Sequence, residues 1–136
     1  MKKMVLDSSC TLGFLMMDEQ DAQSKTVLQA LENGAQAIVP AHWPVEVANS
    51  MRCAFPKRIN EAELAELCEA AADLPVDIDD EPRHRIFKQS VRLATAHNLS
   101  VYDAAYLELA IRENAKLATK DTSLTKAAKA PGVPLF

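Results

Sequence analysis

The chain contains little cysteine, histidine, glycine or aromatic residue for its length. Its 136 residues include 3 Cys, 3 His and 3 Gly, and aromatic side chains make up 5%. The cysteines are widely spaced and form no C-x-x-C pair, which excludes a disulfide framework and suits small buried hydrophobes in a reducing compartment. The histidines lack metal-ligand spacing, so a structural zinc site is not expected either.

Long apolar runs are also missing. No run approaches the length of a membrane span, and the N-terminal segment lacks the apolar stretch of a signal peptide. We therefore expect a soluble, cytoplasmic protein without a membrane partner. Apolar residues make up 49% of the chain, which argues against disorder. The length suits a single domain over residues 1–136 with a substantial core.

The charges are unevenly distributed along the chain. The formal net charge of -4 argues against a large nucleic-acid surface. Residues 60–81 carry nine acids and no Lys or Arg, whereas residues 83–129 carry nine basic residues against four acids. The second region therefore offers a local basic surface despite the acidic total. Ordinary solvated helix faces explain both regions equally well.

Short apolar segments alternate with segments of helical periodicity. Strands are predicted over residues 3–6, 37–40 and 116–119, with shorter possible strands over 76–78 and 133–136. Helices are predicted over residues 8–17, 21–33, 44–55, 60–72, 82–97 and 121–129, with another beginning at Ser100. This alternation predicts an α/β fold, with a central parallel sheet flanked by helices on both faces.

Asp103 lies in the first turn of a segment that is apolar on almost every face. A helix of that kind is buried, so the Asp103 carboxylate lies near the interior and needs a partner. Ser100 offers a local one through a capping interaction. Other acids follow predicted strands or open the helix after one, namely Asp7, Glu46 and Asp121.

These acids are expected to converge, because strand ends and helix starts share one edge of a parallel sheet. Carboxylates a few ångströms apart repel each other, and such a cluster persists only when protons or cations neutralise it. Oxygen ligands without His or Cys favour Mg²⁺ or Mn²⁺. Each acid alone is also explained as a helix cap or a helix-dipole partner, so the joint pattern carries the prediction.

Four segments resemble, in order, the acidic motifs of PIN-domain nucleases. They are VLDSS at 5–9, PVEVAN at 44–49, LSVYDAAYLELA at 99–110 and LATKD at 117–121. The third segment is the most specific. Their order and spacing are similar to those of VapC-type toxins from toxin–antitoxin pairs, although residues 56–82 match only in helical character. The resemblance implies a three-layer PIN-like domain.

The resemblance also implies a metal-dependent endoribonuclease that acts as the toxin of such a pair. Asp7, Glu46, Asp103 and Asp121 would hold one or two Mg²⁺ or Mn²⁺ ions, and a metal-activated water would cleave RNA. Ser9 and Thr119 stand at the family's hydroxyl positions, where they would orient the carboxylates or contact the phosphate. Helix capping and strand packing explain these two hydroxyls as well. The implied partners are an RNA substrate, a cognate antitoxin protein and a second copy in a homodimer.

Further side chains bear on substrate binding. Trp43 is expected to pack in the core or against a partner rather than stack on a base. The acidic stretch at 60–81 is expected to project away from RNA or to face a basic partner. Basic residues that would contact phosphates, or are simply solvated, are Arg83, Arg85, Lys88, Arg92, Lys120 and Lys126.

Two other functions fit parts of the sequence. A catalytically silent PIN-like module that binds RNA or protein is one, and the presence of all four acids argues against it. A phosphoryl-transfer domain is the other. Asp7 follows a strand as in haloacid-dehalogenase-like phosphatases, but Ser9 stands where that family has a second Asp. A receiver domain needs an acidic pair near the first strand, and residues 6–8 contain only one acid.

Overall fold

A parallel four-stranded sheet forms the centre of the molecule. The computed structural model describes residues 3–80 and 83–136. Within them the strands follow the order β3-β2-β1-β4, and every neighbouring pair is parallel. The strands are β1 Lys3–Leu6, β2 Gln36–Val39, β3 Val76–Ile78 and β4 Lys116–Ala118. All the predicted strands but the last therefore form.

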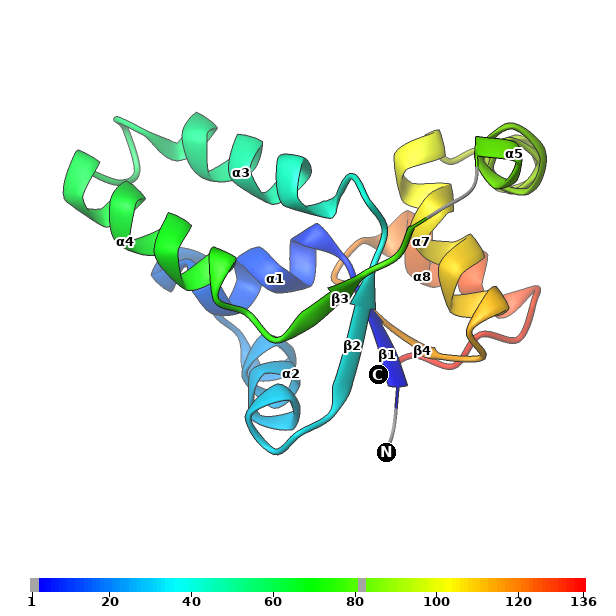
Figure 1. The fold of residues 1–136 in the computed structure, drawn as a ribbon, viewed down its shortest axis with the longest axis horizontal. Coiled ribbons are helices and arrows are strands. Elements are labelled where there is room, and N and C mark those ends of the chain that lie inside the picture. The colour runs from blue at the N-terminus through cyan, green and yellow to red at the C-terminus, as the bar shows by residue number, and fades with distance from the viewer. Residues whose placement is uncertain (1–2, 81–82) are drawn as a thin grey trace.

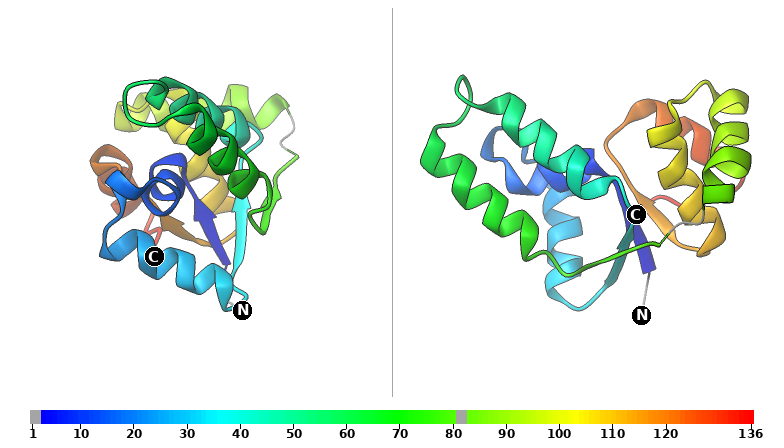
Figure 2. Two further views of the ribbon diagram at one scale, coloured as in Figure 1. Left: turned by 90° about the vertical axis from the view of Figure 1, so that its left-hand side faces the viewer. Right: turned by 45° about the horizontal axis from the view of Figure 1, so that its top comes forward.

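Helices cover both faces of this sheet. Figure 1 shows α1 to α4 on one side of the strands and α5, α7 and α8 on the other. The views in Figure 2 show that α3 and α4 lie side by side. This arrangement confirms the three-layer α/β fold. The helices of the first side are α1 Ser8–Leu15, the short η1 Met17–Glu19, α2 Ala22–Glu32, α3 Trp43–Ala54 and α4 Glu61–Ala72. Those of the second are α5 Arg83–Arg85, η2 Ile86–Ser90, α6 Val91–His97, α7 Val101–Arg112 and α8 Thr122–Lys129.

Side-chain caps set where most of these helices begin. The side chains of Asp7, Asp21, Ser100 and Asp121 each accept a hydrogen bond from a backbone N–H of the first turn. Asn60 does the same for α4 and forms a capping box with its third helical residue. Such caps satisfy backbone donors that have no partner inside the helix. The predicted helix starts are therefore within one or two residues of the observed ones.

Two predicted elements differ from the structure. The helix predicted over 82–97 contains a π-helical segment, Ile86–Ser90, between two α-helical pieces; its expected start, Pro82, lies outside the described residues. Packing of η2 against α7 accompanies this change of winding, and periodicity alone does not reveal it. The expected strand at 133–136 is reduced to one bridge, between Leu117 and Leu135.

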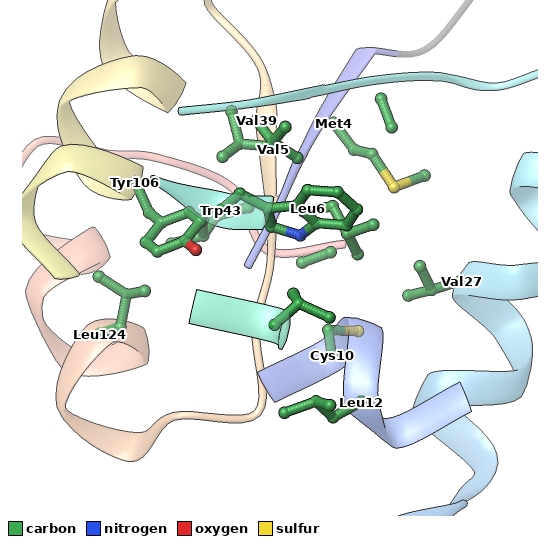
Figure 3. Close-up of a cluster of buried hydrophobic side chains, with 14 of the residues drawn as sticks. Met4, Val5, Leu6, Cys10, Leu12, Val27, Val39, Trp43, Tyr106 and Leu124 are labelled. Atoms are coloured by element: carbon green, nitrogen blue, oxygen red, sulfur yellow. The ribbon is translucent and has the colours of Figure 1, made fainter. Parts of the chain in front are cut away.

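The core joins β1 to the helices on both sides, as the close-up in Figure 3 shows. Residues 4–6 of β1 are fully buried, and so is almost every residue of α7 from Ala104 to Ala110. Trp43 is buried in this core, and its Nε1 donates to Thr11 Oγ1 over 3.0 Å. Core packing of Trp43 is therefore confirmed, and the bond links the start of α3 to α1.

A buried ion-pair network ties the end of β3 to α7. Glu108 is only 4% exposed, and its Oε1 accepts from Arg112 Nε over 3.0 Å. The same guanidinium donates to both carboxylate oxygens of Asp79, over 3.1 and 2.7 Å. The network was not predicted, although a Glu and an Arg four residues apart in an apolar helix are its signal. In the described parts of the chain, no helix is long and apolar enough to cross a bilayer.

Candidate active site

Strand register brings the first and last predicted motifs together. Leu6 of β1 pairs with Ala118 of β4, and the N–H of Asp7 donates to the Ala118 carbonyl over 3.1 Å. Asp7 and Thr119 therefore follow neighbouring parallel strands at the same level. This is the carboxyl edge of the sheet, where ligand sites of open α/β folds form.

The Asp7 carboxylate is buried and accepts several hydrogen bonds. Asp7 as a whole residue is only 4% exposed to solvent. Oδ1 accepts from the N–H of Cys10 over 2.9 Å and from Ser9 Oγ over 2.7 Å, and Oδ2 accepts from Thr119 Oγ1. The two hydroxyls predicted to orient the acids are thus placed against Asp7.

Backbone donors fix the direction of these hydroxyl bonds. Ser9 Oγ accepts from the N–H of Lys120 over 2.9 Å, and Thr119 Oγ1 accepts from the N–H of Asp121 over 2.9 Å. Each hydroxyl oxygen uses a lone pair to accept from the backbone, and its proton points away from that N–H and is donated to Asp7. The loop after β4 therefore presents both hydroxyl protons to the same carboxylate.

Burial raises the pKa of Asp7 from 3.8 to about 6. Hydrogen bonds from Thr119, Cys10 and Ser9 act in the opposite direction, because they favour the charged form. The charge of Asp121 raises the Asp7 pKa further. The fold thus keeps a carboxylate in a place where its charge is unfavourable.

Asp103 lies close enough to two of the other acids for their charges to raise its pKa. It stands in the first turn of α7, where its N–H donates to Ser100 Oγ over 3.1 Å. Burial raises the pKa of Asp103, and the charges of Asp121 and Glu46 raise it further. Asp121 therefore acts on both Asp7 and Asp103, and Glu46 also acts on Asp103. The four predicted acids form one electrostatically coupled group.

Glu46, in the first turn of α3, is held by aromatic neighbours. Its Oε1 accepts from the Tyr106 hydroxyl over 2.7 Å, and its Oε2 lies 4.0 Å from His42 Nε2. The His42 ring packs edge-on against Tyr106, with centroids 5.1 Å apart, and against Tyr102 at 5.6 Å. Burial lowers the pKa of His42 and raises that of Tyr106. Tyr106 therefore remains a hydrogen-bond donor.

Sequence reasoning missed His42 and Tyr106. The signal for Tyr106 is its place three residues after Asp103, which puts both on one face of α7. His42 precedes Glu46 by four residues. It lies in the turn before α3, where the sequence does not predict which way the side chain points. Only the tertiary contact between the start of α3 and the tyrosines of α7 reveals these two side chains.

The acids are near each other but not gathered around one point. Among the described residues, no three His, Cys, Asp or Glu side chains are placed to hold a metal ion as they stand. Asp121 Oδ1 caps α8 by accepting from the N–H of Leu124 over 2.9 Å, and Glu46 is bonded to Tyr106. The described side chains therefore present no complete ligand set as they stand.

In chemistry, the donor set fits a hard divalent cation. All four predicted acids offer carboxylate oxygens, which Mg²⁺ and Mn²⁺ prefer. None of the four forms an ion pair with Lys or Arg in the part of the chain that the structure describes. Two of them have raised pKa values because of burial and neighbouring negative charge. A cation would relieve that repulsion.

The predicted phosphate-binding cations have different surroundings. Lys120 Nζ donates to the Glu19 carbonyl over 2.8 Å and lies 3.3 Å from Asp21 Oδ2, so it ties the β4 loop to the start of α2. Arg85 lies 3.4 Å from buried Glu108. The other members of the set are exposed, namely Arg83, Lys88, Arg92 and Lys126. The acidic side chains of α4 are exposed too, and α4 packs against α3 and α1.

The model of the PIN domain family matches residues 4–130 of this chain. The chain therefore belongs to the PIN-domain family, whose nuclease members generally use a divalent metal. A search of the curated proteins found no match.

Several solved structures share this fold at low sequence identity. A chain of FitAcB from Neisseria gonorrhoeae has a TM-score of 0.68 and 19% identity, over 98% of this chain and 96% of that one. VapBC2 from Rickettsia felis, bound to a DNA fragment from its promoter, gives 0.68 and 15%, over 98% and 97%. VapC20 from Mycobacterium tuberculosis, a toxin that cleaves the sarcin-ricin loop, gives 0.67 and 12%, over 91% and 94%. These likenesses establish the fold.

Proposed function

We propose that this protein is a metal-dependent endoribonuclease and the toxin of a toxin–antitoxin pair. One observation carries the proposal. Four carboxylates from distant parts of the chain lie near one another at the carboxyl edge of the sheet, where their charges interact, and none has a Lys or Arg ion pair among the described residues. Membership of the PIN-domain family supports the same reaction class.

Asp7, Glu46, Asp103 and Asp121 would hold one or two Mg²⁺ or Mn²⁺ ions. A bound divalent ion lowers the pKa of a water and stabilises negative charge on the phosphodiester. Ser9 and Thr119 hold Asp7 in place through hydroxyl protons that the backbone directs toward it. No side-chain nucleophile is needed.

The partners proposed are an RNA substrate, a cognate antitoxin and a second copy of the chain in a homodimer. Support comes from the neighbours, which include a toxin that cleaves the sarcin-ricin loop and a toxin–antitoxin complex on promoter DNA. The exposed acidic face of α4 is suited to a basic partner rather than to RNA, because it would repel phosphates.

Metal titration and RNA cleavage test the proposal together. Wild-type protein is titrated with Mn²⁺ by calorimetry, and cleavage of total RNA is read by sequencing the new 5′ ends. Asp103→Asn is expected to weaken Mn²⁺ binding and to slow cleavage by about a hundredfold or more. The matched control is Asp73→Asn, an exposed acid that follows α4, and it should leave both unchanged. Normal cleavage by Asp103→Asn would contradict the proposal.

A second candidate is a catalytically silent PIN-like module that binds RNA or protein. The observation that favours it is that the acids are not gathered into a ligand set among the described residues. The same titration separates the two functions. A silent module binds no Mn²⁺ at millimolar concentration and leaves RNA intact.

A further inference from the structure

Glu46 has the longest side chain among the four proposed metal ligands. A glutamate carboxylate is separated from the backbone by two methylene groups, and this one is 28% exposed at the start of α3. Asp7, by contrast, is buried and accepts from three donors. A mobile carboxylate loses conformational entropy when it binds an ion, unless another group holds it in place beforehand.

Tyr106 is a rigid group that contacts Glu46. It is 1% exposed and belongs to the buried cluster drawn in Figure 3. Close packing around the ring leaves its hydroxyl a single position, and a buried tyrosine hydroxyl needs a polar partner. That partner is Glu46 Oε1, 2.7 Å away and sixty residues distant in the chain. The core of the protein thus determines where this carboxylate oxygen lies.

A second contact supports the same placement. The His42 ring packs edge-on against Tyr106, with centroids 5.1 Å apart, and its Nε2 lies 4.0 Å from the other oxygen of Glu46. His42 Nε2 is buried and has no hydrogen-bond partner. The Glu46 carboxylate therefore lies between a tyrosine hydroxyl and a histidine ring.

We propose that Tyr106 is a positioning residue that holds the Glu46 carboxylate beside Asp103 for binding of a divalent cation. The proposal rests on the proposed function, because it assumes that these acids bind the ion. Tyr106 follows Asp103 by three residues on α7, so one helix carries both an acid and the group that orients the next. A hydrogen bond of this kind behind a metal ligand typically changes metal affinity by about 10–100-fold.

Tyr106→Phe removes the hydroxyl and keeps the ring. Calorimetric titration with Mn²⁺ alone is expected to show roughly tenfold weaker binding. The matched control is Tyr102→Phe on the same helix, whose ring is 65% exposed, and it should bind Mn²⁺ as the wild type does. RNA cleavage by Tyr106→Phe should return to the wild-type rate when Mn²⁺ is raised about tenfold, since the acids themselves remain. Wild-type Mn²⁺ affinity in Tyr106→Phe would overturn the proposal.

A double-mutant cycle separates positioning from a general structural role. In a Glu46→Gln background, Tyr106→Phe is expected to cause no further loss of Mn²⁺ affinity, because its effect passes through Glu46. An equal, independent loss in both backgrounds would show that the hydroxyl acts on the fold instead. If Tyr106→Phe does not fold, Tyr106→Met, whose flexible apolar side chain also lacks a hydroxyl, takes its place in the cycle.

The proposed function and this inference fail in different ways. When Asp103→Asn weakens Mn²⁺ binding and Tyr106→Phe does not, the metal site stands and Tyr106 has no positioning role. When wild-type protein binds no Mn²⁺, the proposed function fails and the role of Tyr106 with it.

Discussion

The two halves of the proposed site are built differently. On the strand side, Asp7 is held by a backbone N–H and by two hydroxyls whose orientation the backbone of the β4 loop sets. On the helix side, Glu46 is held by a side chain, the Tyr106 hydroxyl, and its other oxygen lies 4.0 Å from His42 Nε2. Backbone-anchored groups move little, whereas side-chain contacts between two helices can rearrange. The comparison suggests a rigid acid at one end and an adjustable one at the other.

The largest expected difference lies in catalysis. Asp7→Asn should slow RNA cleavage by at least about a hundredfold, and Glu46→Gln by about tenfold, because the adjustable ligand is the easier to replace by water. Single-turnover cleavage at saturating Mn²⁺ measures both rates. Equal losses would remove the proposed distinction between the two sides.

The helix side depends on the ion pairs that anchor α7. Arg112→Leu leaves the carboxylates of Glu108 and Asp79 without this partner, and Glu108 is buried. The expected cost is about 3 kcal/mol in the free energy of unfolding, because buried Glu108 keeps only the more distant Arg85, at 3.4 Å, and Asp79 loses both of its bonds to Arg112. Urea denaturation measures it. Adding Glu108→Leu should recover part of the loss, and a double variant as unstable as the single one would argue against this cause.

Raising the pH should reveal the cost of burying the Asp7 charge on the strand side. The pKa of Asp7 is about 6 in the folded protein and 3.8 ordinarily. The folded protein therefore loses stability as the pH rises from about 4 through 6, because Asp7 must then be charged in the interior. Asp7→Asn removes that charge and should stabilise the metal-free protein by about 2 kcal/mol at pH 8.

The gain should shrink as pH falls toward 4, where Asp7 is protonated in the folded wild type as well. Denaturation in the presence of a chelator, at several pH values, measures this trend. Asp73→Asn, at an exposed position, serves as the control and should show no gain. A gain for Asp7→Asn that stays constant with pH would mean that burial of its charge is not the cause.

The smallest effect concerns one hydroxyl. Thr119→Val keeps the shape but removes the bond to Asp7 and the acceptor for the Asp121 N–H, at a cost of about 1–2 kcal/mol. Thermal unfolding of the metal-free protein measures the loss. Thr125→Val, on α8, removes a hydroxyl bond to a local helix carbonyl and should cost less. Equal costs would show that the Asp7 network is no more than local capping.

Much of this architecture follows from local sequence signals. Asp7, Asn60 and Asp121 begin helices because their short side chains reach free N–H groups one turn on. The alternation of apolar strands with such helices allows only a few arrangements, and the parallel sheet is the simplest of them. The prediction that the acid motifs lie near one sheet edge followed from that topology.

Tertiary structure alone decided how those acids are held. The pairing of Leu6 with Ala118 brings Thr119 to Asp7 across 112 residues, and no local pattern encodes that register. The bond from Tyr106 to Glu46 likewise depends on where the fold places the start of α3 relative to α7. Side-chain positions at such contacts result from close packing of the whole core, whereas a cap needs only its own helix. The sequence therefore identifies the candidate acids. The packed core determines that Asp7 is anchored by backbone groups and Glu46 by a side chain.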